Sequence, residues 1–267
     1  MTITSNHDKP RSGRSVAIAV AALLPLVAYG TWQLSRSRTI QLFGEIVPRV
    51  ETERRVIALT FDDGPRTNTV DEILAALAKH DVKATFFLCG AEIRDHPQAA
   101  ARLVAAGHEL GNHSWSHKRM VFKSPSFVAS ELERTDALIR AAGHRGPIHF
   151  RAPYCKKLVG LPWYLAKHDR THVTFDVEPE SDPALDADLQ LLVSEVVANV
   201  RPGSIILLHP WYRGRERSRA AIPLIIEQLK DDGYEFVTVN ELLTNSRKVS
   251  KSQRESLRND LFATLRL

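Results

Sequence analysis

Cysteine is scarce in this sequence, which has only Cys89 and Cys155 among its 267 residues. Two cysteines are too few for a small disulfide-stapled domain or for a zinc ribbon with four cysteine ligands. The sequence also lacks internal repeats and low-complexity tracts. Apolar residues make up 43% and charged residues 25%, which excludes a disordered or collagen-like chain. The length suits one large domain or two small ones.

An excess of positive charge is missing from the central part of the sequence. Residues 51–245 contain 24 basic and 27 acidic residues, a net charge of −3. Residues 1–50 and residues 246–267 each contain six basic and two acidic residues, a net charge of +4. The overall charge of +5 therefore comes from the two ends. Because the centre lacks the electrostatic footprint of a nucleic-acid-binding surface, we predict no nucleic-acid partner.

The N-terminal segment has the pattern of an export signal. Residues 1–15 contain three basic side chains, and residues 16–34 are mostly Ala, Val and Leu. This apolar stretch is just long enough to cross a bilayer core. Small residues at Ala28 and Gly30 leave cleavage of a signal peptide open, but we favour an uncleaved anchor because the stretch is long for a signal peptide. Residues 1–15 would then be cytoplasmic. The rest would lie outside the cytoplasm, attached to the plasma membrane, or secreted after cleavage.

Two polar segments flank the central domain, residues 54–245. Residues 35–53 predict a linker, and residues 246–267 form a basic tail. We interpret the tail as a solvated, partly helical extension, with contact to a membrane surface as the alternative. We expect the protein to be a monomer.

The central domain alternates strand and helix patterns. Apolar runs that predict strands cover residues 56–61, 83–88, 108–110, 148–151, 171–177, 204–208 and 236–239. Helical patterns separate them, and one helix is predicted to begin at Pro125 with Ser124 as its N-cap. This alternation predicts an α/β fold with a parallel sheet. With about seven repeats in roughly 200 residues, closure into a (β/α) barrel is favoured over an open sheet.

Ionisable side chains follow five of the predicted strands. They are Asp62 and Asp63 after the first, His113 and His117 after the third, Arg151 after the fourth, Asp176 and Glu178 at the end of the fifth, and His209 after the sixth. Each has an ordinary explanation by itself, such as a turn at the Asp pair or a buried core histidine at His209. In parallel α/β folds, however, chemistry collects beyond the carboxyl ends of the strands. The shared location therefore predicts a functional site.

Two of these histidines have the spacing of metal ligands. His113 and His117 are four residues apart, and on one helical turn two such imidazoles can bind one metal ion. The Glu that follows the first His in zinc-protease helices is absent, so a base must come from elsewhere. Asp62 and Asp63 are the candidates: one would complete a His/His/Asp metal site and the other would remain a general base.

Four motifs in order resemble those of the polysaccharide deacetylases, carbohydrate esterase family 4, which include nodulation-type chitooligosaccharide deacetylases. They are Thr60-Phe61-Asp62-Asp63-Gly64, His113-Ser114-Trp115-Ser116-His117, Arg151-Ala152-Pro153-Tyr154 and Leu207-Leu208-His209. The resemblance covers about residues 53–245 and identifies residues 54–245 as a catalytic domain. It implies a distorted (β/α) barrel with fewer than eight repeats and metal-dependent removal of acetyl groups from sugars.

The resemblance also implies a metal site. Asp63, His113 and His117 would be the ligands of a divalent ion. Zn²⁺ is favoured, with Co²⁺, Ni²⁺ and Mn²⁺ as alternatives.

The remaining motif residues would act on the substrate. Asp62 resembles the general base, which Arg151 would hold, and His209 resembles the general acid. The backbone N–H of Tyr154 would bind the oxyanion, and Leu207 would line the pocket for the acetyl methyl group.

One family motif is altered in this sequence. The family pattern Asp-x-x-Asp-Trp, which supports the acid histidine, corresponds here to residues 175–182 and lacks the Trp. Asp176 and Glu178 are two residues apart and share a face of the predicted strand, so either can support His209. The missing Trp leaves the shape of the substrate groove open.

Two tryptophans and two cysteines are further candidates for a place in or near the substrate groove. Trp211 or Trp163 would replace the missing Trp in binding substrate, with simple packing as the alternative for both. Cys155 stands where the family often has Gly, and Cys89 ends the second predicted strand. A disulfide between these cysteines is conceivable in an oxidising compartment, but we do not favour it.

The sequence thus predicts a metal-dependent hydrolase that removes N-acetyl groups from N-acetylglucosamine units. Its substrate would be an acetylated cell-envelope or extracellular polysaccharide, whether peptidoglycan, chitin-like or an exopolysaccharide. The alternatives are an O-acetyl polysaccharide esterase and an inactive carbohydrate-binding relative. The complete set of metal ligands and base argues against the inactive relative.

Overall fold

The computed structural model describes residues 12–244, with side chains described from residue 23 onward. In chain order the helices are α1 (Ser12–Arg36), α2 (Val70–Lys79), α3 (Gly90–Asp95), α4 (Pro97–Ala105), α5 (Pro125–Ala141), the 3₁₀ turn η1 (Pro153–Cys155), α6 (Gly160–Lys167), α7 (Pro183–Ala187), α8 (Leu189–Asn199) and α9 (Glu216–Asp231). The strands are β1 (Ile46–Val47), β2 (Val56–Asp62), β3 (Thr85–Leu88), β4 (Glu109–Asn112), β5 (His172–Val173), β6 (Ile205–Leu208) and β7 (Glu235–Phe236).

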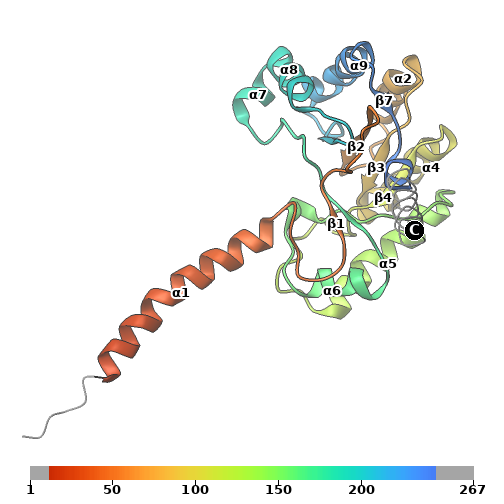
Figure 1. Ribbon diagram of the computed structural model, residues 1–267. Coiled ribbons are helices and arrows are strands. Elements are labelled where there is room, and N and C mark those ends of the chain that lie inside the picture. The colour runs from red at the N-terminus through yellow and green to blue at the C-terminus, as the bar shows by residue number, and fades with distance from the viewer. Residues whose placement is uncertain (1–11, 245–267) are drawn as a thin grey trace, which may run out of the picture.

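The strands pair in parallel, as the sequence predicted for an α/β fold. Strands β4, β3, β2 and β6 lie side by side in that order, and β7 pairs with the start of β2. Strands β1 and β5 form a second, two-stranded sheet. Within the larger sheet, Thr60 of β2 lies opposite Thr85 of β3 and Leu207 of β6. This register brings the carboxyl ends of the central strands together (Figure 1).

Three of the predicted strands are much reduced. Of residues 236–239, only Phe236 belongs to a strand, β7. Residues 148–151 contribute only isolated bridges at Phe150, and residues 171–177 form a regular strand only at β5. The physical reason is a change of partner: the N–H of Val173 donates to the Phe150 carbonyl, whereas the N–H of Leu207 donates to the Val177 carbonyl. The segment therefore crosses from one neighbour to another within a few residues, which interrupts its ladder.

The period of two along β2 decides which side chains meet the helices. Ile57, Leu59 and Phe61 belong to the core cluster that α2, α8 and α9 cover, while Val56 and Ala58 belong to a second cluster on the opposite face. Burying each such large apolar side chain contributes about 1.5–3 kcal/mol to folding. Asp62 continues the face of Val56 and Ala58, because alternate residues of a strand share a face.

Helix α1 extends away from the body of the protein in Figure 1. It includes the predicted anchor, residues 16–34. Within the described residues, we find no helix that combines the length and hydropathy needed to cross a membrane. Residues 1–11 and the predicted basic tail, residues 246–267, lie outside the described residues.

The segment predicted as a linker, residues 35–53, lies against the body. The N–H of Lys157 donates to the carbonyl of Ser35 (2.9 Å), and the hydroxyl of Thr174 donates to the carbonyl of Arg38 (2.6 Å). Strand β1, which pairs with β5, is also part of this segment. Residues 35–47 are therefore fixed in place beside the ends of the strands.

Candidate active site

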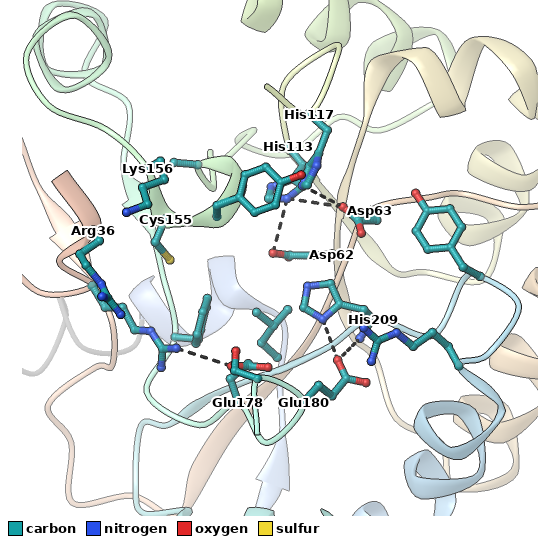
Figure 2. Close-up of a pocket in the computed structure, with 18 residues that line it drawn as sticks. Arg36, Asp62, Asp63, His113, His117, Cys155, Lys156, Glu178, Glu180 and His209 are labelled. Carbon is teal, nitrogen blue, oxygen red and sulfur yellow. Dashed lines mark hydrogen bonds and ion pairs between the residues drawn. The ribbon is translucent and has the colours of Figure 1, made fainter. Parts of the chain in front are cut away.

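A pocket of about 640 Å³ opens beyond the carboxyl ends of β2 and β6 (Figure 2). This volume lies within the range of roughly 300–1,000 Å³ that is common for small-molecule sites. Eight of the predicted site residues line it: Asp62, Asp63, His113, His117, Tyr154, Glu178, Leu207 and His209. The fold thus gathers residues from separate strand ends, as the sequence predicted.

Three of these residues form a cluster with the chemistry of a metal site. Oδ1 of Asp63 lies 3.2 Å from Nε2 of His117 and 3.7 Å from Nε2 of His113. Possible ligand atoms of all three lie within 4.8 Å of one another. Oδ1 of Asp63 is buried and has no hydrogen-bond partner among the described residues. A buried carboxylate oxygen facing two imidazole nitrogens fits a divalent ion such as zinc.

A backbone carbonyl at His113 and burial at His117 keep the two imidazoles in the form that binds metal. Nδ1 of His113 lies 2.9 Å from the carbonyl oxygen of Arg151, and because a carbonyl only accepts, Nδ1 must carry the proton. Nε2 then presents its lone pair to Asp63. Burial and the neighbouring His113 lower the pKa of His117 to about 4, so that this imidazole is neutral at neutral pH.

The histidine pair does not lie on a helical turn, which corrects the sequence-based expectation. Strand β4 ends at Asn112, and both Ser114 and His117 have positive φ angles of 69° and 53°. The N–H of His117 donates to the hydroxyl of Ser114 (3.1 Å). The two imidazoles therefore meet across a tight loop, and their ring centroids are 4.9 Å apart.

Asp62 is held by a buried guanidinium. Nη1 of Arg151 donates to Oδ1 of Asp62 (2.6 Å) and to the hydroxyl of Thr60 (2.9 Å). The other guanidinium nitrogens donate to the carbonyls of Val173 and Thr174. Burial is the largest single influence and by itself would raise the pKa of Asp62. The charge and hydrogen bond of Arg151, together with the neighbouring imidazoles of His113 and His209, outweigh it, and the pKa is lowered. Asp62 is therefore an ionised carboxylate at neutral pH, and its Oδ2 lies 3.7 Å from Nε2 of His113.

His209 is paired with Glu180. Oε2 of Glu180 accepts from the backbone N–H of His209 (2.7 Å) and from its Nδ1 (2.6 Å). Burial alone would lower the pKa of His209, but the hydrogen bond to Glu180, with the charge of Asp62, raises it to about 9. His209 is therefore protonated at neutral pH, and Nε2 carries a proton that faces the pocket.

Proteins of one family resemble this chain in sequence and in structure. Residues 49–181 match the family described as polysaccharide deacetylase. The chain is 36% identical over 201 residues to a chitooligosaccharide deacetylase of Sinorhizobium fredii, covering 70% of this chain and 92% of that protein. The chain belongs to the polysaccharide deacetylase family. It is also 34% identical over 208 residues to the peptidoglycan-N-acetylmuramic acid deacetylase PdaC of Bacillus subtilis, covering 78% of this chain.

The fold matches a solved member of the family. The structure of the peptidoglycan deacetylase PdaC from Bacillus subtilis has a TM-score of 0.67 and 32% sequence identity, covering 78% of this chain and 99% of the solved chain. The present chain spans only 42% of the full length of the PdaC protein.

Tyr154 and Leu207 both line the pocket. Tyr154 is in η1 with φ of 56°, and its exposed ring packs 4.6 Å from the ring of His117. Leu207 is on the same face of β6 as Ile205, and its side chain is almost completely buried at the pocket floor.

The supporting carboxylate of His209 requires a correction. Both oxygens of Asp176 are used elsewhere: Oδ2 accepts from the hydroxyl of Ser204 and Oδ1 from the N–H of Ile205, at the start of β6. Glu178 lines the pocket but pairs with Arg38 at 3.5 Å.

The sequence pattern therefore did not indicate Glu180, although this residue lies in the altered motif. The prediction of Asp176 and Glu178 rests on a strand that continues through residue 177. Regular pairing there is limited to a bridge at Val177, and Glu180 lies in the turn that follows, so the face of a strand does not decide which carboxylate reaches His209. A search of the whole altered motif for any carboxylate would have included Glu180.

Trp211 is also placed differently from the prediction. Its side chain is 1% exposed, does not line the pocket, and packs against Phe86 in the core. A Cβ added at Gly64 would lie 2.5 Å from the Trp211 ring, so this close approach requires glycine at position 64. The Trp211 ring thus packs against the loop that follows Asp63. Trp163 is 42% exposed and does not line the pocket either.

The two cysteines are free thiols and both are buried. Cys155 lines the pocket, whereas the thiol of Cys89 points to the carbonyl of His113 at 3.8 Å. The disulfide that the sequence analysis did not favour is absent.

Replacing Glu180 tests its pairing with His209. In Glu180→Gln, the charge that raises the pKa of His209 is lost. An acid must be protonated to act, so activity falls as pH rises through that pKa. We expect the alkaline limb of the profile of kcat/KM, near pH 9 in the wild type, to move down by about 1–2 units.

Asp176→Asn is the matched control, because the Asp176 carboxylate bonds only to residues at the start of β6 and to nearby Arg201. Its alkaline limb should stay in place. An equal shift in both variants, or none in Glu180→Gln, would contradict the pairing.

Proposed function

We propose that the protein removes N-acetyl groups from N-acetylglucosamine units of a polysaccharide. One observation carries this proposal. An ionised carboxylate, Asp62, and a protonated imidazole, His209, line the same pocket as the Asp63, His113 and His117 cluster. Hydrolysis of an amide needs a base for the water and an acid for the leaving nitrogen, and these two groups have opposite pKa shifts.

Asp63, His113 and His117 would hold the divalent ion, with Zn²⁺ favoured. When bound, such an ion supplies Lewis-acid polarisation of the acetamide carbonyl and lowers the pKa of a nearby water. The protein supplies the orientation: the Arg151 carbonyl fixes the ring of His113, and burial keeps His117 neutral.

Two side chains would move the protons. Asp62 accepts a proton from the attacking water as the water oxygen bonds to the acetamide carbon. Arg151 keeps Asp62 ionised and oriented for this step. As the carbon–nitrogen bond breaks, His209 donates the proton on Nε2 to the sugar nitrogen, and Glu180 stabilises its charged form. The products are acetate and a free amino sugar.

Two further groups would position the acetyl group. The backbone N–H of Tyr154 would donate to the oxyanion, an interaction worth about 3 kcal/mol in the transition state. The buried side chain of Leu207 would contact the acetyl methyl group.

Acetate release from defined substrates tests this function. The full chain loaded with Zn²⁺ should release acetate from tetra-N-acetylchitotetraose. Removal of the metal with a chelator should abolish release, and added Zn²⁺ should restore it. Release from acetyl-xylan alone would identify an O-acetyl esterase. Binding of tetra-N-acetylchitotetraose without acetate release would identify an inactive carbohydrate-binding relative.

We further propose that the strands close into a distorted barrel. The parallel bridges between Asn112 and Phe150, Phe150 and His172, and Val177 and Ile206 support this, because they link the two sheets at both edges. The sheet would then surround the second core cluster.

A location outside the cytoplasm is also proposed, with residues 16–34 as a membrane anchor and a cleaved signal peptide as the alternative. Its support is the order of basic and apolar residues in the sequence. A reporter that works only outside the cytoplasm, fused after residue 245, should be active. Activity that survives deletion of residues 1–35 would contradict the proposal. That the protein is a monomer stays a prediction.

A further inference from the structure

Two cationic side chains line the pocket on the side away from the cluster of Asp63, His113 and His117. Arg36 comes from the end of α1, and Lys156 follows η1 directly. Figure 2 shows both on one side of the pocket, with Asp63 and His209 on the other. The two side chains also approach the same indole: the Arg36 guanidinium lies 4.5 Å and the Lys156 ammonium 5.6 Å from the centre of the Trp32 ring. We call Arg36 and Lys156 the basic rim.

The basic rim is held in place by bonds from Lys157 to the end of α1 and to the residue that follows the helix. The N–H of Lys157 donates to the Ser35 carbonyl, and the ammonium of Lys157 donates to the Ser37 carbonyl. The side chain of Lys157 is buried, so these bonds are shielded from water. Arg36 therefore lies beside Lys156 because their backbone segments are bonded to each other.

The carboxylates that line the pocket do not neutralise the basic rim. Asp62 pairs with Arg151, Glu180 with His209, and Glu178 with Arg38. Asp63 faces the two histidines of the cluster.

Within residues 23–244, neither Arg36 nor Lys156 has an ion pair with an acidic side chain. Burial and the nearby charges of Arg36 and Arg119 lower the pKa of Lys156, as expected for cations that lack a counter-ion.

Resting on the proposed function, we propose that the basic rim binds a carboxylate on the sugar next to the one that loses its acetyl group. The acetamide has to reach Asp63 and Asp62, so a neighbouring sugar would lie toward Arg36 and Lys156. A guanidinium binds a carboxylate with paired hydrogen bonds, and an ammonium adds a point charge. A neutral glycan would leave both cations unpaired. The preferred substrate class is therefore an acidic N-acetylated glycan rather than a neutral chitin-like polymer.

Removing the basic rim should weaken binding of acidic glycans selectively. The test compares the full chain with Arg36→Gln/Lys156→Gln. The probe is glycan strands of alternating N-acetylglucosamine and N-acetylmuramic acid with free lactyl carboxylates, and the same strands with those carboxylates reduced to alcohols. For the acidic strands, the double variant should raise KM about tenfold, whereas KM for the reduced strands should change much less.

A second double variant controls for the loss of two charges. Arg145→Gln/Lys167→Gln removes the same charge from residues that do not line the pocket, and KM for the acidic strands should stay near the wild-type value. Equal changes on both strand types, no change on the acidic strands, or an equal effect of the control variant would overturn the proposal.

Direct binding separates this proposal from the proposed function. Dissociation constants for both strand types are measured without turnover. If the wild type releases no acetate but the basic-rim variant still loses acidic-strand binding selectively, only the proposed function fails. Vesicles containing phosphatidylglycerol test the alternative that the basic rim binds anionic lipid headgroups instead of a glycan carboxylate. If the variant loses vesicle binding but keeps its glycan affinity, the basic rim serves a lipid surface and the proposal is wrong.

Discussion

Asp62→Asn should lower kcat by about 10²–10⁴-fold while the protein keeps its metal. The amide is neutral and cannot take the proton of the attacking water, whereas Asp63, His113 and His117 remain to hold the ion. The structure explains why neighbouring aspartates have different roles. Asp62 continues the face of β2 that carries Val56 and Ala58 and bonds to Arg151, whereas Asp63 follows the strand with φ of 71° and turns toward the histidines.

The variant will also lose stability, because Arg151 becomes a buried charge without its carboxylate. Breaking a buried pair in this way costs about 3–5 kcal/mol. Rates should therefore be measured below the melting temperature, on protein whose folding is checked by circular dichroism. Asp63→Asn is the comparison variant. Its main effect should be weaker metal affinity, whereas the main effect of Asp62→Asn should be slower turnover. If Asp62→Asn loses metal and Asp63→Asn retains it, the two roles are reversed.

His117→Ala should lose bound metal and activity together. Three protein ligands are the usual minimum of a catalytic zinc site, and this change leaves two. Loss of an outer hydrogen-bond partner of a ligand already costs about 10–100-fold in affinity, so loss of a ligand should exceed that range. His117 is the better choice than His113 for the main variant, because its side chain is 28% exposed and leaves a smaller cavity. Metal content by mass spectrometry and acetate release are measured on the same samples.

His168→Ala is the matched control for the loss of an imidazole. His168 lies at the end of α6 against Tyr164, outside the pocket, and metal content should be unchanged. Full metal occupancy in His117→Ala would rule out the assigned metal site.

The sequence predicted much of the site because the decisive information is local. The apolar run of β2 and the Asp pair that follows it are adjacent in the chain, so a buried strand must present Asp62 and Asp63 at its end. The same holds for the segment from β4 to His113 and from β6 to His209. Parallel pairing then brings these ends to one edge of the sheet.

Local patterns were not sufficient where the backbone leaves a regular element. The i,i+4 spacing of His113 and His117 predicted a helical turn, yet a loop with positive φ angles produces the same convergence. Trp211 could equally line a groove or fill a core. Its ring lies in the core, in close contact with Gly64, and no sequence pattern shows that contact.

The sequence by itself determined the alternation of strands and helices and the residues that follow the strands, because hydrophobic periodicity and motif spacing are properties of short segments. Only the tertiary structure decided the partner of His209 and the place of residues 35–47. Glu180 reaches His209 across 29 positions of sequence, and Arg38 and Lys157 are bonded to segments more than a hundred positions away. Such contacts depend on how separate segments pack, since packing is set by the shape and charge of surfaces that form only when the chain folds.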